Sequence, residues 1–370
     1  MKKSKLKHSL TAGVRQAAPP YFVMLLLLTL LLLSLPAAVT LGSAPIPPGE
    51  IYRVIWYHLT ESILGAGKGL GDAARYGQGS LSDIVWFVRL PRLVLAIGVG
   101  SCLSVSGVVM QAVVRNPMAD PYVLGISSGA CLGAILAIVF GLGAVFGSAA
   151  VGSLAFIGAF VISLSVVALA NLGGKANSVK LVLAGTAVAA ICSAVSSFLL
   201  YVINTSSGAV ESVMRWMLGS LAAATWENNL MILPVALIGL LFFWSQYRAL
   251  NLMLLGDEAA MTLGMSLKNR RTMYLLVASL LVGFAVYSAG ILGFVGLVIP
   301  HMVRLLFGNE HKFLLPLTSL LGSIFLLWAD VLCRVIIPRT ELPIGILTSL
   351  IGAPLFIILM AKSSYSFGVD

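Results

Sequence analysis

Long apolar runs dominate this chain and follow one another from Tyr21 to Met360. Each run contains about 20 residues, which is enough for a helix to cross a bilayer. Only 10% of the 370 residues are charged, whereas about 25% are charged in a typical soluble protein. The runs are continuous and do not alternate in polarity as the strands of a membrane β-barrel would. The sequence therefore predicts an all-α integral membrane protein, with residues 1–370 forming a single polytopic domain.

The runs predict about ten transmembrane helices, and an even number places both termini on the same side of the membrane. The spans lie near 21–42, 86–112, 122–142, 149–171, 180–203, 229–247, 272–289, 292–307, 314–334 and 343–361. Cytoplasmic loops of membrane proteins are enriched in Lys and Arg. With the termini inside, 15 of the 23 Lys and Arg residues fall on the cytoplasmic side, and residues 1–20 form a cytoplasmic tail. Short outer helices are expected near 51–64 and 211–218.

The segments between the spans are too short to hold a nucleotide-binding or catalytic domain, so any energy from ATP must come from a partner. The net charge of +10 fits the enrichment of basic residues in cytoplasmic loops. These residues are too scattered to indicate nucleic-acid binding. The four histidines do not cluster and the four cysteines form no CxxC pair, so we predict no metal site. The chain is expected to act within the lipid bilayer, without catalytic residues or a cofactor of its own.

The motif RLPR at 89–92 opens the second span at the outer surface of the membrane. Proline is tolerated in the first turn of a helix because no internal hydrogen bond is lost there. Both arginines would then face outward, either as anchors for lipid headgroups or as a platform for a partner that carries carboxylates. Near the outer end of the ninth span, Asp330 and Arg334 are four residues apart and can pair on one helix face.

The segment MQAVVRNPMADPYVLGISSG at 110–129 contains two helix-breaking pairs, Asn116-Pro117 and Asp120-Pro121. The chain should turn there at the inner surface of the membrane. One interpretation is an ordinary helical hairpin with close packing, because small residues follow the turn. The other is a constriction at the inner mouth of a transport pathway.

The segment LGDEAAMTLG at 255–264 places helix-forming residues and an acidic pair between two glycines. It lies within 248–271, which we predict to be a cytoplasmic coupling segment. A short amphipathic helix there could enter the groove of a cytoplasmic protein. A solvated loop helix is the alternative.

Taken together, these motifs resemble the permease subunits of type II ABC importers, the FecCD-type family that imports iron–siderophore complexes, haem and cobalamin. The matching stretches follow the family's order from about residue 86 to the end: RLPR (89–92), SGVVMQAVVRNPMADPYVLGISSGA (106–130), LVLAG (181–185), LGDEAAMTLG (255–264), GFVGLVIPHMVRLLFG (293–308), ADVLCR (329–334) and ELPIGILTSLIGAP (341–354). The resemblance implies the type II permease fold in a bacterial or archaeal cytoplasmic membrane. It also implies a second permease subunit in a homodimer, two ATP-binding subunits that hold ATP and Mg, and an extracytoplasmic substrate-binding protein.

The resemblance further assigns roles to individual residues. The coupling element that contacts the ATPase would comprise Leu255, Gly256, Asp257, Glu258, Ala260, Leu263 and Gly264. The outer arginines that pair with the binding protein would be Arg89, Arg92 and Arg334. The inner gate would comprise Asn116, Pro117, Met118, Asn177, Ser178 and Val179, and the pathway would be lined by Thr186, Ser193, Ser196 and Ser197.

The mechanism that the resemblance implies is alternating access, driven by the ATPase partner. An iron chelate, either a siderophore complex or haem, is the leading substrate, and cobalamin carried by the same machinery is the alternative. A secondary transporter driven by protons or sodium is a further hypothesis. No chain of carboxylates crosses the predicted spans, which argues against it.

Overall fold

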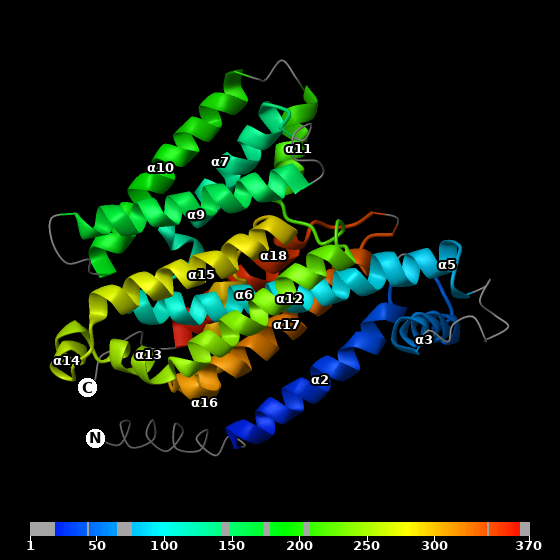
Figure 1. Ribbon diagram of the computed structural model, residues 1–370, viewed down its shortest axis with the longest axis horizontal. Helices are drawn as coiled ribbons and strands as arrows, with labels where there is room; N and C mark the ends of the chain where they lie inside the picture. Colours follow the sequence, from blue (N-terminus) through cyan, green and yellow to red (C-terminus); the bar gives the residue numbers. More distant parts are fainter. Residues whose placement is uncertain are drawn as a thin grey trace.

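The computed structural model describes residues 19–42, 44–64, 76–142, 149–172, 178–202, 207–338 and 340–362. Over these ranges every regular element is a helix. Most of the long helices run along the long axis of the molecule, with α13 and α14 at one end and α3 and α5 at the other (Figure 1). This arrangement confirms the all-α prediction for the described part of the chain.

Within the described ranges, eight helical segments are long and apolar enough to cross a membrane. They are α2 (Pro20–Thr40), Ser80–Val114, α9 (Ala150–Asn171), α10 (Ser178–Val202), α12 (Trp226–Ser245), α15 (Leu267–Ala289), α17 (His311–Val335) and α18 (Ile344–Lys362). Two shorter apolar helices, α7 (Ile126–Val139) and α16 (Val295–Phe307), account for the remaining two predicted spans. The connecting elements are α3 (Pro48–Leu64), the 3-10 helix η3 (Pro121–Leu124), α11 (Ser207–Met217), α13 (Tyr247–Leu254) and α14 (Asp257–Thr262). The two predicted outer helices correspond to α3 and α11.

The two shorter helices begin later than the sequence predicted. The chain before α7 contains Gly125 at φ 72°, and the chain before α16 contains Gly290 at φ 71° and Phe294 at φ 68°. These positive φ angles break the helices. The two irregular segments support each other, because the backbone N–H of Leu292 donates to the hydroxyl of Tyr122 at 3.3 Å. Irregular backbone at membrane depth is tolerated where it is buried in protein in this way.

Pro91 lies in the first turn of α6, as predicted, but α6 continues an earlier helical segment. The segment Ser80–Val114 comprises α5 (Ser80–Ser82), the π-helix η2 (Asp83–Arg89) and α6 (Leu90–Val114), so the helix begins eleven residues before the proline. In an α-helix the ring of Pro91 would clash with the carbonyl four residues earlier. The wider π-helical turn directly before the proline avoids this clash.

The central helix of the bundle is α6. It packs against α12, α15, α16 and α17, and nearly all of its residues from Pro91 to Val114 are buried. A Cβ atom on Gly107 would lie 1.8 Å from the carbonyl oxygen of Gly296 in α16, and one on Gly100 would lie 2.4 Å from that of Gly322 in α17. Small residues bring membrane helices this close, so α6 is held by backbone contact on two sides.

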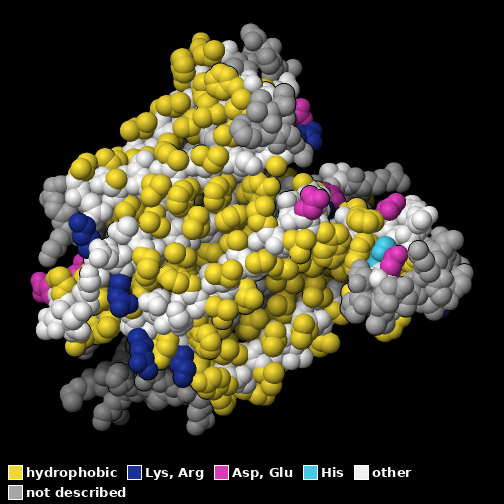
Figure 2. Space-filling view, viewed as in Figure 1, with side chains coloured by type: hydrophobic (Ala, Val, Ile, Leu, Met, Phe, Trp, Pro, Cys, Tyr) yellow, Lys and Arg dark blue, Asp and Glu magenta, His cyan; other side chains and the backbone are white. Residues whose placement is uncertain are grey.

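The surface has the pattern expected of a membrane protein. Apolar side chains cover the flanks of the long helices, and basic side chains gather at the end that carries α13 and α14 (Figure 2). The cytoplasmic location of the 248–271 segment stays a prediction.

We expect Gly107→Ala to destabilise the protein, because the added methyl group would overlap the backbone of α16. Overpacking of this kind costs about 1–3 kcal/mol. The matched control is Gly49→Ala in α3, where a Cβ would meet no atom within 4 Å. Thermal unfolding in detergent should show a lower Tm for the first variant only. Equal Tm values would contradict the close α6–α16 contact.

Candidate functional site

Five charged side chains meet at the ends of α6 and α17 that we predict to face the outside. The Nε of Arg92 donates to Asp330 Oδ1 at 2.6 Å, and its Nη1 donates to Glu341 Oε2 at 2.8 Å. Asp330 also pairs with Arg334, with 3.1 Å between Oδ2 and Nε, which confirms the pairing predicted from their spacing. Arg89 donates to backbone carbonyls at the end of α2. We call these five residues the outer charge cluster.

The three arginines of the cluster are buried: Arg89, Arg92 and Arg334 are 3%, 4% and 5% exposed. The expectation that they face outward from the membrane surface is therefore wrong. The end of α2 covers Arg89, and α17 supplies the buried carboxylate of Asp330 to the other two. Lipid-headgroup anchoring does not fit this burial either. Docking to carboxylates of a partner stays a prediction, and the exposed acid of the cluster is Glu341, whose side chain is 44% exposed.

A polar hollow of about 390 Å³ lies between α7 and α10. Its polar lining residues are Ser127, Ser128, Cys131, Ser193, Ser196 and Ser197. Three of the four predicted pathway residues therefore lie around one hollow. The fourth, Thr186, does not line it. Thr186 is exposed further along α10, and its hydroxyl donates to the backbone carbonyl of Leu183 at 3.0 Å.

The hydroxyl of Ser196 differs from those of two other helical serines. Ser165 and Ser212 donate to the carbonyls four residues earlier at 2.8 Å each. Ser196 is 7% exposed, and its buried hydroxyl has no hydrogen-bond partner among the described residues. A buried polar group without a partner costs about 1–3 kcal/mol. The hollow thus holds an unused hydrogen-bonding group.

The contribution of α7 to the hollow was not predicted. The small residues that follow the turn at 116–121 suggest packing or a constriction, and the spacing of the four cysteines assigns them no role. Cys102, Cys192 and Cys333 are buried, whereas Cys131 is half-buried and faces the hollow. The spacing of Ser127, Ser128 and Cys131 on one side of a short helix is the signal that could have indicated a lining face.

The two predicted gate segments lie at helix ends. Asn116 Oδ1 accepts a hydrogen bond from the backbone N–H of Met118 at 2.9 Å, which fixes the turn after α6. Ser178 is the first residue of α10, and Val179 is 65% exposed. Asn177 lies outside the described residues. Pro117 follows Asn116 in the turn, and the gating role of these residues stays a prediction.

The predicted coupling helix is α14, which glycines flank on both sides. Gly256 has φ 111° and Gly264 has φ 83°, angles that side chains on L-residues rarely allow. The exposed residues are Leu255 at 55%, Met261 at 44% and Leu263 at 61%, and Glu258 and Gly264 are exposed as well. This end of the chain therefore presents apolar side chains to the surroundings.

Three of the predicted coupling residues face the body of the protein instead. Ala260 is fully buried, and Gly256 is buried close to the guanidinium group of Arg115. Asp257 forms a salt bridge of 2.8 Å with Arg271, whose side chain is 4% exposed. These three residues thus face the body of the protein, and the salt bridge of Asp257 joins α14 to α15. The coupling role of the segment stays a prediction.

Comparisons with known proteins agree with this architecture. The family model described as the FecCD transport family matches residues 26–362. The hemin transport system permease HmuU of Yersinia pestis is 41% identical over 295 residues, which cover 76% of this chain and 86% of HmuU. The cobalamin import permease BtuC of Halobacterium salinarum is 42% identical over 277 residues, which cover 75% of this chain and 73% of that protein.

A solved structure shows the same fold. It is described as an inward-facing conformation of a metal-chelate type ABC transporter, and it matches with a TM-score of 0.74 at 30% identity, covering 93% of this chain and 100% of the other. The chain belongs to the FecCD transport family. It is a multi-pass permease subunit of an ABC importer, and it is not the catalytic subunit.

We expect Asp257→Ala to lower the free energy of unfolding by about 1–2 kcal/mol, because it removes two hydrogen bonds to a buried guanidinium group. Glu258→Gln is the matched control, since this neighbouring acid is exposed. Urea or thermal unfolding in detergent should separate the two variants. A loss of stability in the Glu258 variant alone would contradict the observed orientation of α14.

Proposed function

We propose that this chain is the membrane subunit of an importer for an iron chelate, either haem or a siderophore complex, with cobalamin as the alternative cargo. The observation that supports it most directly is the polar hollow, because serines from α7 and α10 offer hydrogen bonds without a charge that would trap the cargo. The similarity to HmuU, a hemin transport permease, supports the first substrate class. The similarity to BtuC supports the alternative.

The chain would work as one half of a permease homodimer in a bacterial or archaeal cytoplasmic membrane, with both termini in the cytoplasm. Two ATP-binding subunits would supply the energy, and an extracytoplasmic binding protein would deliver the cargo. ATP binding would move α14, and the shift of the bundle would open the pathway alternately toward each side. Such a machine needs the two conformations to differ in their affinity for the partners.

The ion-coupled alternative would need a titratable group near the pathway. Burial raises the pKa of Asp120, in the inner turn, to about 6. Its carboxylate already accepts a hydrogen bond from the backbone N–H of Tyr122 at 2.8 Å and caps η3. Uptake that depends on a pH gradient and not on ATP would favour the ion-coupled transporter.

The direct test is uptake by vesicles that contain the permease, its ATPase and its binding protein. Haem, a ferric siderophore and cobalamin are supplied separately. We expect accumulation of one of the iron chelates only when ATP is present with the ATPase. Exclusive uptake of cobalamin would select the alternative substrate, and uptake without ATP would reject the proposal.

The hollow can be tested by filling it. Ser193→Phe combined with Ser197→Phe should nearly abolish uptake, because both positions are exposed toward the hollow and a ring would occupy it. Val195→Phe is the matched control, since this residue is exposed on the same helix at 41% but does not line the hollow. Normal uptake by the double variant would show that the cargo takes another route.

The coupling role of α14 predicts that Leu263→Glu weakens binding of the ATP-binding subunit by about tenfold or more, as for an interface anchor worth at least about 1.4 kcal/mol. Leu172→Glu is the matched control, because that leucine is 68% exposed at the end of α9. Binding can be measured with purified subunits in nanodiscs. Equal affinities of the two variants would contradict the coupling role.

A further inference from the structure

The outer charge cluster contains two acids that share one arginine. Arg92 donates through Nε to Asp330, and through Nη1 to both carboxylate oxygens of Glu341 at 3.0 and 2.8 Å. Asp330 comes from the middle of the outer half of α17, whereas Glu341 comes from the loop before α18. Arg92 thus joins α6 to two separate parts of the chain.

Only one of these acids can leave the arginine. The side chain of Asp330 is 0% exposed and also pairs with Arg334, whereas that of Glu341 is 44% exposed. The salt bridge between Arg92 and Glu341 is exposed to water on the Glu341 side only, so water can solvate the released carboxylate, while Arg92 needs another carboxylate in its place. Removing Asp330 would instead leave buried charges uncompensated. The exchangeable position on Arg92 is therefore the one that Glu341 occupies.

The position of Glu341 in the chain connects this contact to α18, which begins three residues later at Ile344. The backbone N–H of Leu342 donates to Cys333 O at 3.1 Å, and that of Gly345 donates to Leu218 O at 3.0 Å. A Cβ on Gly345 would lie 2.4 Å from Leu218 O and 3.3 Å from Ile291 O. The first turn of α18 therefore packs directly against two backbone segments, one at Leu218 and one at Ile291.

These two backbone segments also border the polar hollow. Ile291 lines the hollow, and so does Met217, which directly precedes Leu218. A displacement of the loop at Glu341 would thus reach the hollow through the contacts of Gly345. This is a continuous series of physical contacts, and coupling along it is open to measurement.

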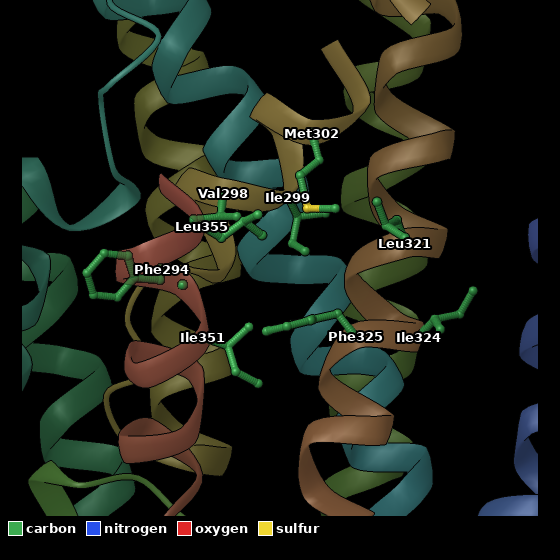
Figure 3. A pocket seen from close by; sticks show the side chains of 10 residues that line it. Phe294, Val298, Ile299, Met302, Leu321, Ile324, Phe325, Ile351 and Leu355 are labelled. Carbon is green, nitrogen blue, oxygen red and sulfur yellow. The ribbon is translucent and has the colours of Figure 1, made fainter. Parts of the chain in front are cut away.

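The rest of α18 borders a cavity, although Gly352 packs closely against Phe294. An apolar cavity of about 260 Å³ separates it from α16 and α17, with Phe294, Ile351 and Leu355 among the lining side chains (Figure 3). Helices packed without such a gap resist displacement because each contact would be lost. The tight contacts of α18 with its neighbours include those at its N-terminal end, which lies beside the outer charge cluster.

From these observations we propose that Glu341 occupies, in the resting permease, the place on Arg92 that a carboxylate of the extracytoplasmic binding protein takes over on docking. The inference rests on the proposed function as an importer with such a partner. The exchange keeps the number of charges and of hydrogen bonds to Arg92 constant. It releases Glu341 into water and loosens the start of α18 beside the hollow, so docking is transmitted to the pathway.

The test measures how tightly the permease complex in nanodiscs binds the extracytoplasmic binding protein of the same importer. Glu341→Gln retains the shape of the side chain but weakens its bond to Arg92, so that it competes less well with a carboxylate of the binding protein. The binding protein should therefore bind about tenfold more tightly, which corresponds to the free energy of one charge-assisted hydrogen bond. ATP hydrolysis without the binding protein should also rise. Glu227→Gln, an exposed acid at the start of α12, is the matched control and should change neither quantity.

Unchanged or weaker binding by the Glu341→Gln complex would overturn the inference. If that variant does not fold, Glu341→Asp carries the test, because the shorter acid keeps the charge but cannot reach Arg92 with the same geometry. Tighter binding by it supports the exchange, and unchanged binding rejects it. Failure of the wild-type complex to bind the protein at all would reject the proposed function instead, so the two failures are distinguishable.

Discussion

The structure depends on the close approach of α6 to its neighbours. Backbone groups cannot be left without hydrogen bonds in hydrocarbon, so each span is a helix and the helices can only be held together by packing and by a few polar contacts. Gly107 against Gly296 and Gly100 against Gly322 bring α6 to within backbone contact of α16 and α17. The helices that carry the functional residues are positioned around this central element.

The same helix connects the two ends of the molecule. Arg92, at its outer end, holds Asp330 and Glu341. At the inner end, the side-chain carbonyl of Gln111 accepts a hydrogen bond of 2.6 Å from Arg304 of α16, directly before the turn at Asn116. The outer charge cluster and the inner turn thus lie at opposite ends of one helix, α6. The hollow between α7 and α10 lies beside this helix. A rigid central helix with movable neighbours suits a protein that alternates between two openings.

The sequence predicted the features that depend on local chemistry. Apolar runs located the spans, and the two glycines around 257–262 located α14, because glycine permits the positive φ angles that end helices. It did not predict features that depend on how helices rotate and pack. The burial of Arg89 and Arg92 arises from α2 and α17, and Arg334 contacts the end of α2, all of them far away in the sequence. The meeting of Ser127 and Cys131 with Ser193 and Ser196 likewise depends on the packing of α7 against α10.

The central claim is that the hollow between α7 and α10 lies on the route of the cargo, and Cys131 offers a native reporter. It is half-buried in the hollow, whereas Cys102, Cys192 and Cys333 are 0%, 3% and 0% exposed. The decisive measurement is the rate at which a membrane-impermeant thiol reagent modifies Cys131 in the assembled transporter, with and without ATP and cargo. The account predicts that the rate changes with nucleotide and falls when cargo is present. A rate that is the same in every state would contradict it.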